Sequence, residues 1–320
     1  MRITDAEFTA AWHKLGSPQA VANHLGLPIR SVYDRRRNLG RKGIRLETRG
    51  PHVSQEWGAV GWTFPREVQI ELEDGVIVVS SDHHYWPGEP TVAHKALLHV
   101  IKKTKPKICV VNGDVFDGVS ICRHPPFGWT TRPSVKDELE ACQDRLHEIE
   151  MACDVSKTKC QLMWNIGNHD IRFERTLATN ADAFSGIDGF RLSDHFPRWE
   201  MQWSMLVNPT SKTPVMIKHR LAGGVHAAYN NTMKGGLSIV TGHTHLLEVK
   251  PYGDYRGRRW GVQTGTLGNP HGPQFEYTEN APCNSCSGFA VLTIRNGELL
   301  PPELCEVIDG KALFRGEIIA

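Results

Sequence analysis

The stretch QLMWNIGNHDIRFE, residues 161–174, decides the fold. Its first six residues have the character of a buried strand, and Gly167 ends the run. Three polar residues, Asn168, His169 and Asp170, follow without a spacer. Burying such side chains without partners costs about 1–3 kcal/mol for each group. The stretch therefore predicts that other parts of the chain supply partners at the end of this strand.

Four other predicted strands end in the same kinds of residue. Strand 76–80 is followed by Asp82, His83 and His84, and strand 108–112 is followed by Asp114 and Asp117. The stretch TPVMIKH ends at His219, and the stretch LSIVTGHTH ends with His243 and His245. Helices are predicted over residues 92–103 and 134–153, between the strands. Strands that alternate with helices indicate an α/β sheet, in which ligands bind beyond the carboxyl ends of the strands.

The residue types at these strand ends suit divalent ions. Carboxylates and imidazoles bind ions such as Mn, Fe or Zn. No thiolate belongs to the set, which argues against a closed structural zinc centre. A carboxylate shared by two ions about 3.5–4 Å apart serves in-line displacement at phosphorus. The pattern therefore predicts a two-metal centre. The separate pair Cys283 and Cys286, with Cys305, is either a second metal site or a plain loop.

The blocks resemble those of the calcineurin-like metallophosphoesterase superfamily, whose pattern is D-x-H, G-D-x-x-D, G-N-H-D/E, a later His, and G-H-x-H. Here the blocks read DHH at 82–84, GDVFD at 113–117, GNHD at 167–170, His219, and GHTH at 242–245. The resemblance implies an α/β fold made of a two-sheet sandwich flanked by helices. It also implies two divalent ions, with Mn expected and Fe, Zn or Mg as alternatives, and a hydroxide bridging them as the nucleophile.

The resemblance also implies the ligands of each ion. One ion would bind Asp82, His84, Asp114 and His245. The other would bind Asp114, Asn168, His219 and His243, so that Asp114 bridges the two. The family usually has Gly after the later His, whereas this chain has His219 followed by Arg220 and His226 followed by Ala227. His219 is the preferred ligand because it ends an apolar strand, which leaves His226 as a candidate substrate contact.

Three further residues receive roles from the resemblance. His169 would donate a proton to the leaving oxygen or stabilise the transition state. Asp170 would orient His169, as carboxylates do for imidazoles. Asp117 would hold the metal ligands in place without binding a metal ion itself.

The N-terminal segment differs in charge from the rest of the chain. Residues 1–50 contain ten Lys/Arg and four Asp/Glu, whereas residues 51–320 have a net charge of −4. Three short helices are predicted here, with a capping box at Thr4 and Glu7 and a glycine turn at Gly26. This spacing favours a helix-turn-helix whose Arg30, Arg35 and Arg37 contact DNA. The alternative is a three-helix bundle that binds protein. The predicted domains are 1–45, a linker at 46–65, and a phosphoesterase domain at 66–320.

The substrate is predicted from the surroundings of the second block. Gly118 stands where the protein Ser/Thr phosphatases of the superfamily have Arg, and GDVFDG resembles its DNA-repair nucleases and small phosphodiesterases. Arg123, His124 and Trp129 would contact nucleic acid, or they belong to a packed loop. A helix-turn-helix fused to this domain also resembles phage and prophage metallophosphoesterases.

These patterns predict a metal-dependent phosphodiesterase acting on DNA, a nuclease. One alternative is a phosphatase for nucleotides or phosphoproteins tethered to DNA. Another is a DNA-binding regulator with a vestigial metal site. The chain is 40% hydrophobic and 22% charged, with no apolar run of 18 residues and no signal-peptide core at its start. We therefore expect a cytoplasmic protein without a membrane partner.

Overall fold

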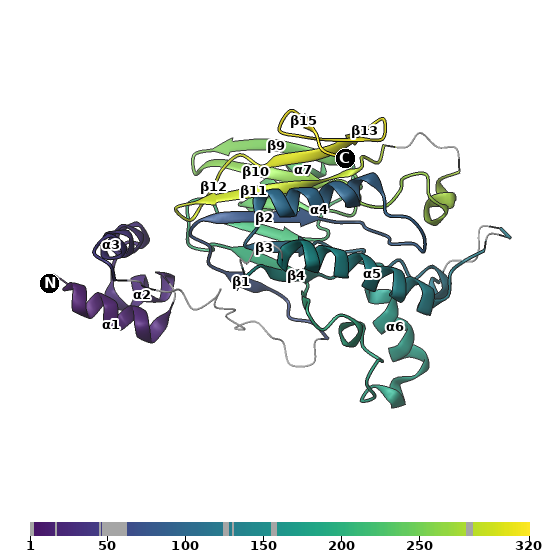
Figure 1. Ribbon diagram of the computed structural model, residues 1–320, viewed down its shortest axis with the longest axis horizontal. Helices are drawn as coiled ribbons and strands as arrows, with labels where there is room; N and C mark the ends of the chain where they lie inside the picture. The colour runs from purple at the N-terminus through teal and green to yellow at the C-terminus, as the bar shows by residue number, and fades with distance from the viewer. Residues whose placement is uncertain are drawn as a thin grey trace.

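Two β-sheets pack face to face in the larger part of the molecule, and helices cover their outer faces (Figure 1). The computed structural model describes residues 3–16, 18–44, 46, 63–123, 128–129, 131–154, 159–279 and 284–320. The predicted fold class, an α/β two-sheet sandwich preceded by a helical segment, is confirmed.

The first sheet has six strands. In spatial order they are β1 (Val68–Ile70), β6 (Ser204–Val207), β7 (Val215–Lys218), β8 (Ser238–Thr241), β10 (Gly257–Thr264) and β9 (Leu247–Asp254). The neighbours β7, β8 and β10 are parallel, while β9 is an antiparallel edge strand. The carboxyl ends of β7 and β8 therefore lie side by side.

The second sheet has nine strands. In spatial order they are β15 (Glu317–Ile318), β14 (Lys311–Phe314), β13 (Glu303–Ile308), β11 (Gly288–Arg295), β2 (Gly75–Ser80), β3 (Ile108–Val111), β4 (Gln161–Asn165) and β5 (Glu200–Gln202), with β12 (Glu298–Leu299) paired to β11. Strands β2 to β5 are parallel. Three of the predicted polar strand ends, those of β2, β3 and β4, are thus adjacent at one edge.

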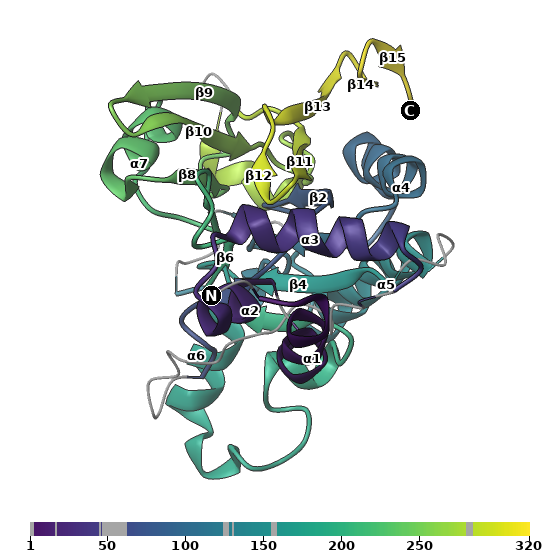
Figure 2. The same cartoon turned by 90° about the vertical axis from the view of Figure 1, so that its left-hand side faces the viewer.

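Helices lie on both outer sides of the sandwich. The helices after the first strands are α4 (Val92–Thr104), α5 (Val135–Asp154), α6 (Ile171–Asn180) and α7 (Ala227–Gly235), with short 3-10 turns η1 (Val119–Ile121), η2 (Asp182–Phe184), η3 (Leu192–His195) and η4 (Pro273–Thr278). Figure 2 shows α4 and α7 on opposite sides of the two sheets. None of the helices in the described ranges is both long and apolar enough to cross a membrane.

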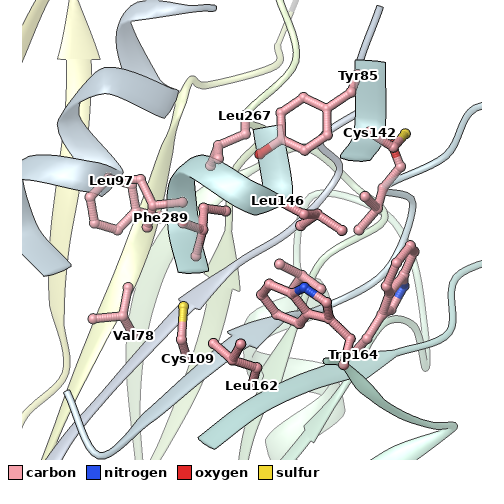
Figure 3. Packing of buried hydrophobic residues seen from close by; sticks show 14 of the residues in the cluster. Val78, Tyr85, Leu97, Cys109, Cys142, Leu146, Leu162, Trp164, Leu267 and Phe289 are labelled. Atoms are coloured by element: carbon pink, nitrogen blue, oxygen red, sulfur yellow. The ribbon is translucent and has the colours of Figure 1, made fainter. Parts of the chain in front are cut away.

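The side-chain alternation of β2 explains the layers. Ile77 and Val79 point into the space between the two sheets, whereas Val78 points toward the helices, as the two-residue period of a strand requires. Figure 3 shows the helix side of this core, where Val78 and Cys109 of the sheet face Leu97 of α4 and Leu146 of α5. Both faces of the central strands are therefore buried, and only their ends are available for polar chemistry.

Three N-terminal helices form a small unit with its own core. They are α1 (Asp5–Leu15), α2 (Pro18–Leu25) and α3 (Ile29–Arg41). Phe8, Trp12, Val32 and Leu39 are buried between them, together with Leu46 from the predicted linker. The capping box of Thr4 with Glu7 and the left-handed Gly26 occur as predicted.

The helical unit contacts the larger domain through α3. Arg36 donates a hydrogen bond to Glu73 at 2.5 Å, and Arg37 donates one to Asn296 at 2.6 Å. Glu73 precedes β2, and Asn296 follows β11, the antiparallel partner of β2. Both contacts are thus at the end of the sandwich opposite the carboxyl end of β2. Of the predicted linker, residues 47–62 lie outside the described ranges.

Candidate metal centre

Polar residues from both sheets meet beyond the carboxyl ends of β2, β3, β4, β7 and β8. Three sets of side chains bring their ligand atoms within 4.8 Å of one another, and they are Asp82 with His84 and His245, His84 with Asp114 and His169, and Asp114 with His219 and His243. Five of these residues have a positive φ, namely Asp82, His84, Asp114, His243 and His245. Such backbone strain in residues other than glycine is typical of functional sites.

The first set lies at the end of β2. His245 Nε2 is 3.3 Å from Asp82 Oδ1, and His84 stands beside both. His84 Nδ1 donates a hydrogen bond to Asp117 Oδ1 at 2.9 Å, whereas its Nε2 is buried and has no hydrogen-bond partner in the described structure. A buried nitrogen without a partner is costly unless a ligand completes it. This nitrogen fits a metal ion.

The set of Asp114, His219 and His243 joins the two sheets. His219, at the end of β7 in the first sheet, has its Nε2 3.1 Å from Asp114 Oδ2 and 3.2 Å from Asn168 Oδ1. Its ring packs against that of His243, 5.4 Å away between centroids. His226 instead caps α7 and is exposed. The structure therefore places His219 among the predicted ligands, and His226 on the surface.

The histidines are held so that one nitrogen faces the carboxylates. His219 donates from Nδ1 to the Asn112 carbonyl at 2.8 Å, and His84 donates from Nδ1 to Asp117. His245 has Nδ1 3.5 Å from the Ser285 hydroxyl. An anchored Nδ1 fixes the tautomer and leaves Nε2 as the ligand. The donor set of carboxylate, imidazole and amide oxygen fits two divalent ions that share Asp114.

The electrostatics of the site follow from the pairing of acids with imidazoles. Burial raises the pKa of Asp114, but the adjacent His219 and His169 lower it more, so that it lies well below its usual range. Burial lowers the pKa of His219, but Asp114 outweighs this effect and raises it to about 10. Without metal, a protonated His219 therefore balances the buried charge of Asp114.

His169 is oriented by a different carboxylate from the one predicted. We expected Asp170 to hold it, but His169 Nδ1 lies 2.6 Å from Asp117 Oδ1, and within the described residues the Asp170 carboxylate forms no hydrogen bond with the His169 ring. Arg172, which sequence reasoning missed, lies one helical turn later and has Nη2 3.1 Å from His169 Nε2. Burial lowers the pKa of His169, but Asp114 and Asp117 raise it above its usual value overall.

Asp170 organises the backbone instead. Its carboxylate accepts hydrogen bonds from the backbone N–H groups of Asp114, Val115, Phe116 and Gly167 and from the Trp164 indole, at 2.8–3.1 Å. It thereby ties the loop after β3 to the loop after β4. Gly167 is required in this arrangement because a Cβ there would overlap the backbone nitrogen and carboxylate of Asp114. Asp170 is fully buried, so it touches no substrate.

Three buried amides link the two sheets beneath the site. Gln202 donates to Asn165, and Asn165 donates to Asn112 and to the Ile217 carbonyl of β7. Asn112 in turn donates to the Lys218 carbonyl, next to His219. The sequence does contain a signal for Asn112 and Asn165, because each is a polar residue at the end of an otherwise apolar strand. This chain of amides sets the position of His219 relative to Asp114.

Comparison with known proteins identifies the class to which this site belongs. Residues 75–275 match the family model of the calcineurin-like phosphoesterases. The match covers more than half of the chain, and the chain belongs to this family. The resemblance predicted from the motif blocks is thus confirmed, and the protein is a metallophosphoesterase, a class of hydrolases.

Two proteins of similar sequence come from phages, and one solved structure was also compared. The chain is 28% identical over 266 residues to the Gene 54 protein of Mycobacterium phage L5, and the match covers 76% of this chain and 97% of that protein. It is 27% identical over 265 residues to the Gene 54 protein of Mycobacterium phage D29, with the same coverage. A dimetal phosphatase from Danio rerio aligns with 70% of this chain and 97% of its own, at 9% identity and a TM-score of 0.29.

Asp170→Asn should destabilise the protein and weaken metal retention together. An amide has one acceptor oxygen, so at least two buried N–H groups would lose their partner, which lowers the free energy of unfolding by about 2–4 kcal/mol. Denaturant unfolding and elemental analysis of the purified variant test this expectation. The control is Asp188→Asn, an exposed position. Equal stability of the two variants would contradict the organising role of Asp170.

Proposed function

We propose that the protein is a dinuclear-metal-dependent phosphodiesterase that acts on DNA. The observation that carries the proposal is the convergence of three sets of ligand atoms, which are Asp82 with His84 and His245, Asp114 with His219 and His243, and a set of His84, Asp114 and His169 that connects the other two. One ion would be held by Asp82, His84, Asp114 and His245. The other would be held by Asp114, Asn168, His219 and His243. Ions bound in this way would acidify a water molecule and neutralise phosphate oxygens. Mn is the expected ion, with Fe, Zn or Mg as alternatives.

His169 is the proposed proton donor to the leaving oxygen. Asp117 accepts the hydrogen bond of its Nδ1 and so directs Nε2 toward the ligand sets, where Asp114 Oδ2 is 3.9 Å away. In the metal-free chain burial and Arg172 lower the pKa of His169, while Asp114 and Asp117 raise it, and a general acid must be protonated to act. Arg172 beside Nε2 would bind a phosphate oxygen next to the transferred proton.

A diester substrate is favoured over a phosphoprotein by the residue after the second block. Gly118 has a φ of +66°, and a Cβ there would lie 2.9 Å from the Phe116 ring. The arginine of the protein phosphatases would therefore not fit at this position without rearrangement. A phosphatase for nucleotides, tethered to DNA, remains the alternative. A DNA-binding regulator with a vestigial metal site is disfavoured, because every metal ligand that the family pattern requires is present in this chain.

The DNA part of the proposal rests on charge and exposure. The segment 1–50 has an excess of six positive charges. Within it, Arg30 is exposed, whereas Arg35 is paired with Asp5 at 2.9 Å and Arg37 is bonded to Asn296. Beyond the second block, Arg123 and Trp129 are exposed, and His124 lies outside the described residues. These exposed groups are proposed contacts to phosphates and bases.

An assay panel with Mn tests the function. It contains linear and circular DNA, single- and double-stranded, a bis-aryl phosphodiester and an aryl phosphomonoester. We expect hydrolysis of DNA and of the small diester to exceed that of the monoester. A preference for the monoester would support the nucleotide phosphatase instead.

Asp114→Asn, purified in parallel, is the control for contaminating nucleases. One neutral amide cannot hold two cations as a carboxylate does. Both hydrolysis and metal content should therefore be lost. Retention of two tightly bound ions in elemental analysis would exclude Asp114 as the shared ligand.

His169→Gln should keep the metals and lose rate. General acids typically contribute about 10²–10⁴-fold to turnover. The loss should be smaller for diesters with good leaving groups, because these need no proton. Steady-state kinetics with a series of aryl leaving groups measures this dependence. An equal loss across the series would argue against proton donation.

Arg30→Glu should weaken DNA binding and flatten its salt dependence, because fewer counterions are released when fewer phosphates are contacted. Fluorescence anisotropy at several salt concentrations measures both quantities. Lys311→Glu reverses an exposed charge on β14 as the matched control. If both variants bind DNA alike, the N-terminal helices are better interpreted as a protein-binding bundle.

A further inference from the structure

Arg220 stands next to the set of Asp114, His219 and His243. It directly follows His219 at the carboxyl end of β7, and its side chain is exposed. In the described part of the chain its guanidinium forms no hydrogen bond or ion pair. It is close enough to act on His243, whose pKa is lowered by burial first, then by His219, and also by Arg220. Arg220 is therefore a cation beside the site without a partner inside the protein.

Other arginines near this region are already engaged. Arg172 donates to the Asp117 carbonyl at 2.8 Å and approaches His169. Arg259 is buried, donates to the Gly236 carbonyl at 2.6 Å and pairs with Asp254. An arginine engaged in this way has fewer donors left for a ligand, whereas Arg220 keeps all five.

The backbone that presents Arg220 is fixed from within the fold. The buried Asn231 of α7 accepts from the Ala222 N–H at 2.9 Å and donates to the Ala222 carbonyl at 3.3 Å. A Cβ at the next residues, Gly223 or Gly224, would meet no other atom within 4 Å. The backbone is thus held by hydrogen bonds before Arg220, at the His219 carbonyl, and after it, at Ala222, so that a ligand meets a prepared position.

The chain segment around Arg220 has the opposite charge from the domain that contains it. Residues 218–260 contain seven Lys/Arg, of which only Arg259 is buried, and two Asp/Glu, although residues 51–320 as a whole have a net charge of −4. Both acids are paired within this segment, Glu248 with Lys250 at 3.0 Å and Asp254 with Arg259. The segment comprises α7, β8, β9 and β10, which form one side of the molecule in Figure 2.

We infer that Arg220 binds a phosphate of the DNA strand next to the phosphate that is cleaved, and that the strand continues over the basic surface of residues 218–260. The inference rests on the proposed function and adds the direction in which the polymer leaves the site. A guanidinium binds phosphate through two parallel hydrogen bonds, which positions it as well as attracts it. Arg220 is thus a specificity residue that favours a polymer over a small ester.

The test compares two substrates. Arg220→Ala should lower the ratio of kcat/KM for an oligonucleotide to kcat/KM for a bis-aryl phosphodiester about 10- to 100-fold, because the small diester has no second phosphate. Arg220→Lys should restore part of this ratio, since it keeps the charge but not the paired geometry. Lys212→Ala removes one charge at the other end of β7 and should leave the ratio unchanged.

A binding measurement separates this inference from the proposed function. In the Asp114→Asn background, a fluorescent oligonucleotide should bind more weakly when Arg220 is Ala, and the salt slope should fall by about one. This readout needs no hydrolysis, so an inactive wild-type protein would refute the function without deciding the role of Arg220. Equal affinity of the Arg220→Ala and Lys212→Ala proteins, or equal loss on both substrates, would overturn the inference.

Discussion

One buried carboxylate, that of Asp170, holds the two loops on which the centre is built. It accepts five N–H groups, four of them from the backbone after β3 and β4. Burial, and to a lesser extent the nearby Asp114, raise the pKa of Asp170 to about 6, so both oppose its ionised form. The N–H donors act in the other direction, because hydrogen bonds to a carboxylate favour the charged state. The left-handed backbone of Asp114 and the position of His169 both depend on this balance.

The second constraint is that ligands from two separate sheets must meet. Asp82, Asp114 and Asn168 belong to one sheet, and His219 and His243 to the other. The amides of Gln202, Asn165 and Asn112 connect the sheets at this end. Ser81 adds a further link, with its hydroxyl 2.5 Å from that of Thr264 on β10. Gln202, Asn165 and Asn112 are each hydrogen-bonded within the fold, so the two sheets cannot slide past each other without losing these bonds.

Much of this could be predicted from sequence because strand ends are local features. Five apolar runs that stop at Asp, Asn or His indicated both the sheet edge and the ligand types. The orientation of His169 by Asp117 instead of Asp170 could not be predicted, since it depends on which loop faces which ring. Arg35 was expected among the DNA contacts of α3, and the structure pairs it with Asp5 of α1. Helical periodicity shows which face a residue occupies, and it contains no information about a neighbouring helix.

The protonated state of His219 has a consequence for how the centre is filled. Its pKa near 10 means that a proton occupies Nε2 at neutral pH in the metal-free chain. Uptake of an ion at that nitrogen is therefore an exchange of one cation for another, and it releases acid to the solvent. Below about pH 10, each unit of acidification strengthens the competing proton tenfold. Acid should thus lower the occupancy of the site, and the proton on His219 then balances part of the charge of Asp114.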